Sequence, residues 1–113
     1  MSGLKPRPLS PYAAEAARLL GARIRFARRQ RGWSQEDLAE RVGVTARTIY
    51  KVERGDPTVR LGAAFESAAL LGVSLFDPDV SRLTLDLDRV QARDALLSRP
   101  VGRHRTSDVR DDF

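Results

Sequence analysis

The chain lacks cysteine and has a single histidine, and these two absences exclude several classes of function. Without cysteine, neither a disulfide framework nor a thiolate metal site can form. The histidine, His104, lies in a polar stretch near the C-terminus, where we interpret it as exposed rather than as a ligand or base. The sequence has no glycine-rich phosphate loop, no metal-ligand spacing and no base near its acidic pairs. We therefore expect a protein that is not an enzyme and that has no catalytic residues, metal or cofactor.

Long apolar runs are also missing. No stretch approaches the ~18 consecutive apolar residues of a membrane span, and Lys5 and Arg7 are not followed by the apolar segment of a signal peptide. The 113 residues suit one compact domain with short tails. A domain this small buries about two-thirds of its chain surface, so its core must be economical or shared with a partner subunit. We expect a soluble cytoplasmic protein.

Positive charge is abundant but unevenly placed. Residues 1–60 hold 13 Lys and Arg and 6 Asp and Glu, a net charge of +7. Residues 61–113 hold 7 Arg and 9 Asp and Glu, a net charge of −2. A basic front half favours a polyanionic partner, although a basic domain without such a partner would have the same composition.

Capping residues and hydrophobic spacing predict a long first helix. Ser10 can cap the free amides, Pro11 suits the first helical position, and Gly32 ends the helix near Arg31. The inward face recurs at spacings of three and four, with arginines opposite. Its predicted members are Ala13, Ala16, Ala17, Leu20, Ile24 and Ala27, and Arg18, Arg25 and Arg29 lie on the other face.

Two short helices follow. Ser34, with Asp37 three residues later, predicts a loose capping box, and Gly43 ends this second helix. Thr45 caps a third helix that runs to about Arg54. The predicted inward residues are Leu38, Ala39, Val42, Val44, Ile49 and Val52.

The rear half is expected to complete the core and add an extension. A fourth helix spans about Val59 to Leu71, with Leu61, Ala64, Phe65, Ala68 and Leu71 inward, and Val73, Leu75 and Phe76 close the core as a plug. Asp77-Pro78-Asp79 is a candidate start for a short fifth helix. The alternation of Leu83, Leu85 and Leu87 predicts a strand over 82–88 that could pair with its twin across a dimer axis. A short helix would bury those leucines equally well, and residues 89–97 are a further candidate helix.

This pattern predicts four segments. They are a flexible arm at 1–9, a DNA-binding domain at 10–76, a dimerisation extension at 77–98 and a disordered polar tail at 99–113.

The second and third predicted helices have the residues that a helix-turn-helix requires. Ala39 is small enough for two helices to cross closely, and Gly43 permits the tight turn between them. The third helix is then held out as a rod of about the width of the DNA major groove. The residues left on or near its outer face are Thr45, Ala46, Arg47, Thr48, Tyr50 and Lys51.

The segment Ser34–Gly55 closely resembles the Xre-type, lambda-repressor-like helix-turn-helix family. Ser-Gln opens its second helix, Leu-Ala lies inside it, Gly-Val forms the turn, Thr-Ile lies in the third helix and Glu-Arg-Gly ends it. The resemblance covers about Leu20 to Phe76. It implies an all-α domain of four or five helices that usually binds palindromic operator DNA as a homodimer.

The resemblance also implies roles for single residues. Gln35 would contact a phosphate or brace the recognition helix, and Thr45 would cap that helix and touch phosphate. Arg47 and Tyr50 are the candidates for base-edge contacts, although Arg47 could instead contact phosphate alone. Together with Lys51 and Arg54 as phosphate contacts, and with Ala46 and Thr48, they form the predicted DNA-binding set.

Three further residues have implied structural roles. Arg28 and Glu53 match a family pair that joins the first helix to the third, either as a partly buried ion pair or as an exposed, energetically idle one. Trp33 is interpreted as a core plug or hydrophobic staple rather than a base-stacking residue.

A weaker resemblance concerns the whole chain. Ser10-Pro11-Tyr12 before a long helix, the Gly-Asp-Pro-Thr turn at 55–58 and the ending Asp111-Asp112-Phe113 look like HipB-type antitoxins. Such proteins are dimers that repress their own operon and bind a HipA-type kinase toxin, so the terminal Phe113 is a candidate toxin-binding residue with Asp111 and Asp112. The alternatives are a stand-alone Xre-type repressor and a protein-interaction module without DNA, although the basic third helix would be unnecessary for the latter.

Overall fold

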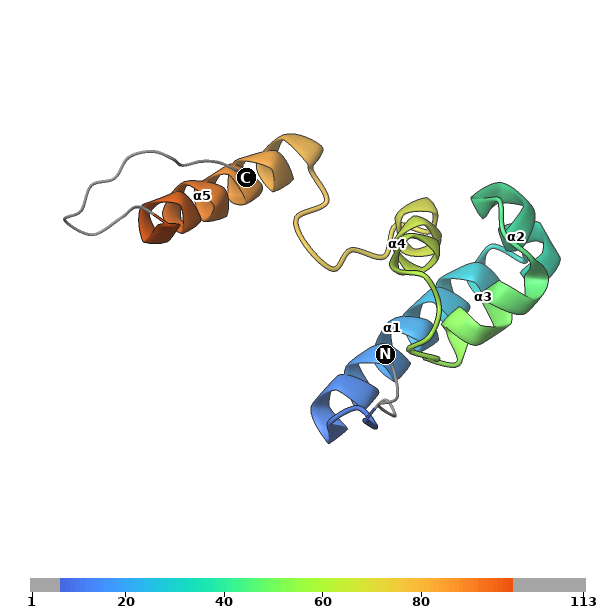
Figure 1. Ribbon diagram of the computed structural model, residues 1–113. Coiled ribbons are helices and arrows are strands. Elements are labelled where there is room, and N and C mark those ends of the chain that lie inside the picture. Colours follow the sequence, from blue (N-terminus) through green and yellow to red (C-terminus); the bar gives the residue numbers. More distant parts are fainter. Residues whose placement is uncertain (1–6, 99–113) are drawn as a thin grey trace. The chain divides into compact units, whose positions relative to one another are not determined.

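The computed structural model describes residues 7–98, and within that range it contains five α-helices and no strand (Figure 1). The all-α expectation is therefore confirmed. The predicted tail, with His104, Asp111, Asp112 and Phe113, lies outside the described residues, as do residues 1–6 of the predicted arm. The helices are α1 (Pro11–Gln30), α2 (Gln35–Val42), α3 (Ala46–Glu53), α4 (Leu61–Leu70) and α5 (Val80–Ser98).

The chain divides into two compact units, residues 1–74 and residues 75–113. The first unit carries α1 to α4, and the second carries α5. The predicted DNA-binding domain, 10–76, ends two residues later than the first unit.

Local hydrogen bonds set the starts of the first three helices where the sequence predicts them. The Ala13 amide donates to Ser10 Oγ (3.3 Å), and the Thr48 amide donates to Thr45 Oγ1 (3.1 Å). At α2 the capping box is complete, because the Asp37 amide donates to Ser34 Oγ (3.0 Å) and the Ser34 amide donates to Asp37 Oδ2 (2.9 Å). These bonds satisfy amides that a helix start leaves without partners.

The core of the first unit is made of small and medium-sized apolar residues. Partly buried neighbours pack around it, among them Leu20, Ala27, Val44 and Trp33, so the core-plug interpretation of Trp33 is confirmed. Ala16, predicted to face inward from α1, is exposed, because α1 buries residues only from Gly21 onward. The buried apolar cluster comprises Ile24, Leu38, Ala39, Ile49, Val52, Ala64, Ala68 and Leu71.

Helix α4 presents a different face to the core from the predicted one. Leu61 and Phe65 are 69% and 38% exposed, although both were expected inside. The buried stripe consists of small residues, Ala63, Ala64, Ser67 and Ala68. Small side chains permit a close approach of α4 to its neighbours, which leaves the large side chains at the edge and outside of the helix.

The predicted strand over 82–88 is wrong, and so is the plug at Leu75 and Phe76. Residues 80–98 form one 19-residue helix rather than a short one, and Leu75 and Phe76 are exposed in the second unit. A strand needs a neighbouring strand for its backbone groups, whereas a helix satisfies them within the segment. Val73 does pack against the core, where its amide donates to the Ala68 carbonyl (2.8 Å).

Candidate nucleic-acid interface

Helices α2 and α3 are joined by a tight turn that fixes the direction of α3. Gly43 has a φ of +87°, a left-handed conformation that side chains rarely adopt. The amides of Gly43 and Val44 both donate to the Ala39 carbonyl, at 2.8 and 3.0 Å. The buried Ala39 side chain is small, so α3 can pack closely against α2 and present its opposite side outward.

The outward side of α3 carries three aligned side chains. The guanidinium carbons of Arg47 and Arg54 lie 5.7 and 5.5 Å from the centre of the Tyr50 ring, one helical turn before and after it. All three side chains are exposed, Tyr50 by 41%. We call them the Arg–Tyr–Arg row. Cation–π contacts hold the guanidiniums beside the ring, so the row presents two positive donor groups at defined positions.

The other members of the predicted set surround this row. Thr45 is exposed and caps α3, and its hydroxyl lies 3.0 Å from that of Thr48. Lys51 is half-buried, and Ala46 packs partly against the core. Gln35 is also half-buried. The structure therefore brings the set to one region of the first unit, but with unequal access to a ligand.

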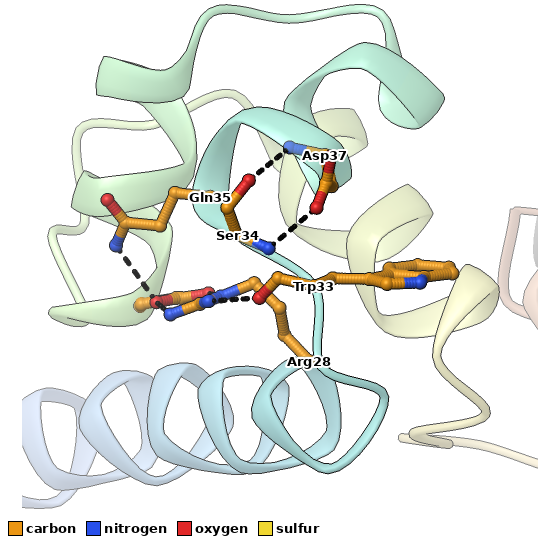
Figure 2. Close-up of polar contacts among 6 residues, drawn as sticks. Arg28, Trp33, Ser34, Gln35 and Asp37 are labelled. Carbon is orange, nitrogen blue, oxygen red and sulfur yellow. Dashed lines mark hydrogen bonds and ion pairs between the residues drawn. The ribbon is translucent and has the colours of Figure 1, made fainter.

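Gln35 lies in a buried polar network that ties three elements together (Figure 2). The Arg28 guanidinium donates to both carboxylate oxygens of Glu53, from Nε at 2.6 Å and from Nη2 at 3.0 Å. Its Nη1 donates to the Trp33 carbonyl (2.6 Å), and the Gln35 amide Nε2 donates to Glu53 Oε1 (3.1 Å). Gln35 was expected either to contact a phosphate or to brace α3. Its hydrogen bond to Glu53, the last residue of α3, agrees with the bracing role.

The pairing of Arg28 with Glu53 is buried rather than exposed. The two residues are 8% and 7% exposed, and both oxygens of the carboxylate accept hydrogen bonds. A buried, bidentate Arg–carboxylate contact has a defined geometry that a single-point ion pair lacks. The contact joins α1 to the last residue of α3 and so orients α3.

Two features of this region escaped the sequence analysis. Gly21 lies where α1 crosses α3, and a Cβ there would be 2.5 Å from the Val52 carbonyl oxygen and 2.6 Å from that of Glu53. In addition, a cleft between α1 and α3 is lined by Arg18, Arg25 and Arg54, next to Tyr50. Arg25 therefore extends the basic side chains beside α3 onto α1, whereas Arg18 is paired with Glu15, which also lines the cleft. The spacing of the arginines places them on one side of α1, but only the helix crossing shows which element that side approaches.

The turn after α3 is held by Asp56. The amide and hydroxyl of Thr58 donate to Asp56 Oδ1, at 2.8 and 2.7 Å. These hydrogen bonds lower the pKa of the Asp56 carboxyl, and the nearby charges of Lys51 and Arg47 lower it further. Within residues 7–98 no group of three acidic or histidine side chains is placed to hold a metal ion, and no helix is long and apolar enough to span a membrane.

Comparison with known proteins agrees with this geometry. A helix-turn-helix family profile matches residues 24–77. An uncharacterized HTH-type transcriptional regulator from Methanocaldococcus jannaschii is 37% identical over 57 residues, which are 49% of this chain and 83% of the relative. The chain belongs to the helix-turn-helix family. A second uncharacterized HTH-type transcriptional regulator, from Methanothermobacter thermautotrophicus, is 47% identical over 49 residues, 43% of this chain and 71% of the relative.

The helix-turn-helix match begins inside α1 and ends before α5. It contains the network of Arg28, Gln35 and Glu53 and the whole Arg–Tyr–Arg row. Helix α5 lies outside the matched residues, so family membership describes the first unit and leaves the second to be interpreted from its own residues.

Proposed function

We propose that this chain is a sequence-specific DNA-binding regulator of transcription. The observation that carries the proposal is the Arg–Tyr–Arg row on the outward side of α3, in a domain of the helix-turn-helix family. In this class the recognition helix enters the major groove and its N-terminal residues meet base edges. The names of the two relatives, both HTH-type transcriptional regulators, support the same function.

In this proposal Arg47 and Tyr50 read the DNA and later residues anchor it. Arg47 lies in the first turn of α3, where a guanidinium can donate two hydrogen bonds to guanine. Tyr50 can contact a thymine methyl or a phosphate. Lys51 in the last turn of α3 and Arg54 directly after it lie nearer the DNA backbone, and Thr45 contacts phosphate at the start of the helix.

We further propose that the chain acts as a homodimer on a palindromic operator. Two copies related by a two-fold axis would present two α3 helices to half-sites about one helical turn apart. The first unit is small and its core residues are mostly small, which fits a fold that gains stability from a partner subunit.

The narrower proposal is an autorepressing antitoxin of a HipA-type kinase toxin. Its support is the sequence resemblance at the start of α1, at the Gly55–Thr58 turn and at Asp111-Asp112-Phe113. The alternative is a stand-alone repressor. A HipA-like kinase reading frame beside this gene, together with co-purification that fails when residues 111–113 are deleted, would support the antitoxin role. If no such reading frame lies beside the gene and no kinase co-purifies with the chain, the stand-alone repressor is favoured.

The central test is a selection of bound sequences from random duplex DNA. It is followed by measurement of the affinities of the parent and three variants for the selected operator and for scrambled DNA. Arg47→Ala should weaken operator binding by about 5- to 150-fold while changing scrambled-DNA binding less, because a base contact is lost. Lys51→Ala should weaken both more evenly and reduce the salt slope by about one unit.

Arg23→Ala, an exposed arginine of α1 that lies beside Phe26 and Val73 rather than beside α3, is the matched control and should change the operator preference little. Enrichment of no sequence in the selection would contradict a sequence-specific function. An equal loss of both affinities in Arg47→Ala would reduce Arg47 to a phosphate contact.

A further inference from the structure

Helix α5 is long, partly apolar and almost wholly exposed. Every residue from Val80 to Leu97 is exposed, including five leucines and two valines. An isolated helix of about this length is marginal in water, since helices in proteins gain most of their stability from packing an apolar face. The segment therefore requires a surface against which to pack.

The apolar residues of α5 follow a coiled-coil repeat. One stripe recurs at alternating spacings of three and four residues, which is the a and d pattern of two helices packed side by side. Five of its six positions are apolar, and the sixth is an aspartate. The stripe consists of Val80, Leu83, Leu87, Val90, Asp94 and Leu97.

We propose that this stripe packs against the α5 helix of a second copy of the chain, as an antiparallel two-helix coiled coil. The inference specifies the pairing mode of the homodimer proposed above and rests on that part of the proposed function. The charged residues beside the stripe favour a second copy of α5 as the partner and favour one orientation of the two helices.

A parallel pair would place like charges in the interface. In parallel register each a position faces the same position of the other chain, so Asp94 would face Asp94 of the partner subunit. The flanking residue Asp86 would lie near Gln91 of the partner subunit, without an opposite charge. Burial of two facing carboxylates is unfavourable, so this register opposes a parallel dimer.

An antiparallel pair removes both difficulties. Its layers join Val80 to Leu97 of the partner subunit, Leu87 to Val90 of the partner subunit, and Leu83 to Asp94 of the partner subunit. The two aspartates then lie at opposite ends of the interface.

The antiparallel register also pairs opposite charges beside the layers. Asp86 comes beside Arg93 of the partner subunit, and by symmetry this contact occurs twice. Within its own helix Asp86 contacts Arg89 at 3.4 Å, but both side chains are largely exposed, and such a pair is weak. The carboxylate can accept hydrogen bonds from both arginines.

The helix supplies its own control. Leu85 and Leu87 are 52% and 55% exposed, but Leu85 lies on the opposite side of α5 from the stripe. The same substitution at the two positions therefore has the same effect on helix propensity and a different effect on the proposed interface.

The first test measures the monomer–dimer equilibrium of the full chain by sedimentation equilibrium, without DNA. Leu87→Asp should weaken dimerisation by about 100-fold or more, because it removes apolar burial on both chains and adds two charges. Leu85→Asp should change it by less than about threefold. A full-length protein that is monomeric, or equal losses in both variants, would overturn the proposal.

The second test determines the orientation and uses the absence of native cysteine. When Leu83→Cys and Asp94→Cys chains are mixed and oxidised, an antiparallel dimer should yield a disulfide between the two different chains. Leu83→Cys alone should form few disulfides, since the two sites would lie about 16 Å apart along the axis. Efficient self-cross-linking of Leu83→Cys would indicate a parallel pair and overturn the proposal. Neither test involves DNA, so failure here leaves DNA binding standing, and a dimer without operator affinity would contradict the DNA-binding proposal alone.

Discussion

The Arg28 guanidinium has partners for Nε and for both terminal nitrogens. It donates to two oxygens of Glu53 and to the Trp33 carbonyl, in a buried position. Gln35 adds a fourth hydrogen bond to the same network through Glu53. Removal of one partner would leave the other as an uncompensated buried charge, which costs more than the intact pair contributes.

We expect Arg28→Ala to lower the free energy of unfolding by about 3–5 kcal/mol, because Glu53 would remain charged and buried. Urea denaturation followed by circular dichroism measures this change. The control is Arg18→Ala, whose partner Glu15 lies 3.2 Å away with both side chains largely exposed, and which should cost less than about 1 kcal/mol. Similar losses in the two variants would show that the buried network has no special role in stability.

Asp37 gives stability a dependence on acid pH. The Ser34 amide and hydroxyl hydrogen-bond to its carboxylate and lower its pKa below that of a free aspartate. A lowered pKa stabilises the fold above the unfolded value, and that contribution is lost as pH falls through the folded value. In thermal melts between pH 7 and pH 2.5, the melting temperature of Asp37→Asn should therefore fall less steeply with decreasing pH than that of the parent. Identical slopes in the parent and in Asp37→Asn would contradict this account.

At the scale of elements, the crossing of α1 over α3 depends on the absence of a side chain at Gly21. The backbone carbonyls of Val52 and Glu53 occupy the space that a Cβ would need. This close approach brings Arg28 within reach of Glu53 and places the arginines of α1 beside the recognition helix.

Gly21→Ala should destabilise the protein by about 1–3 kcal/mol, since α1 must move away from α3, and should also weaken DNA binding. Gly62→Ala is the matched control, because a Cβ there meets nothing within 4 Å and α4 continues through this position. It should leave stability unchanged or raise it by up to about 1 kcal/mol. Chemical denaturation of both variants compares the two sites directly, and a neutral Gly21→Ala would contradict the described crossing.

At the scale of the whole molecule, positive charge is concentrated in the part of the chain proposed to bind DNA, and the part proposed to form the dimer is slightly negative. Residues 1–60, which carry the recognition helix, have a net charge of +7, and residues 61–113 have −2. Attraction to DNA therefore originates in the first unit, and the proposed pairing helix adds little to it.

We expect the affinity for duplex DNA to fall steeply with salt, by about a thousandfold between 50 and 200 mM if a dimer neutralises about six phosphates. Fluorescence anisotropy titrations with a labelled duplex at several salt concentrations give the slope. Leu85→Asp, which changes charge but not the recognition helix, should keep a slope close to that of the parent. An affinity that does not change with salt would contradict the electrostatic account of binding.

The sequence alone determined the features that depend on a few consecutive residues. The capping box of Ser34 and Asp37, the left-handed turn at Gly43 and the helix-turn-helix resemblance were all predictable, because each rests on hydrogen bonds or spacings within about four residues. The partnership of Arg28 with Glu53 came from the family resemblance, and local patterns would not have found it.

Only the tertiary structure decided the features that depend on which other helix packs against a residue. Gly21 matters because α3 crosses there, and α4 buries Ser67 rather than Phe65 because its neighbours approach too closely for a ring. The same limit explains residues 82–88, whose leucines fit both a strand and a helix. With no partner strand in the described part of the chain, the helix satisfies the backbone and places Leu83 and Leu87 on one side of α5 and Leu85 on the other. The spacing of apolar residues describes only one of the two helices in a contact, whereas the burial of a side chain depends on both.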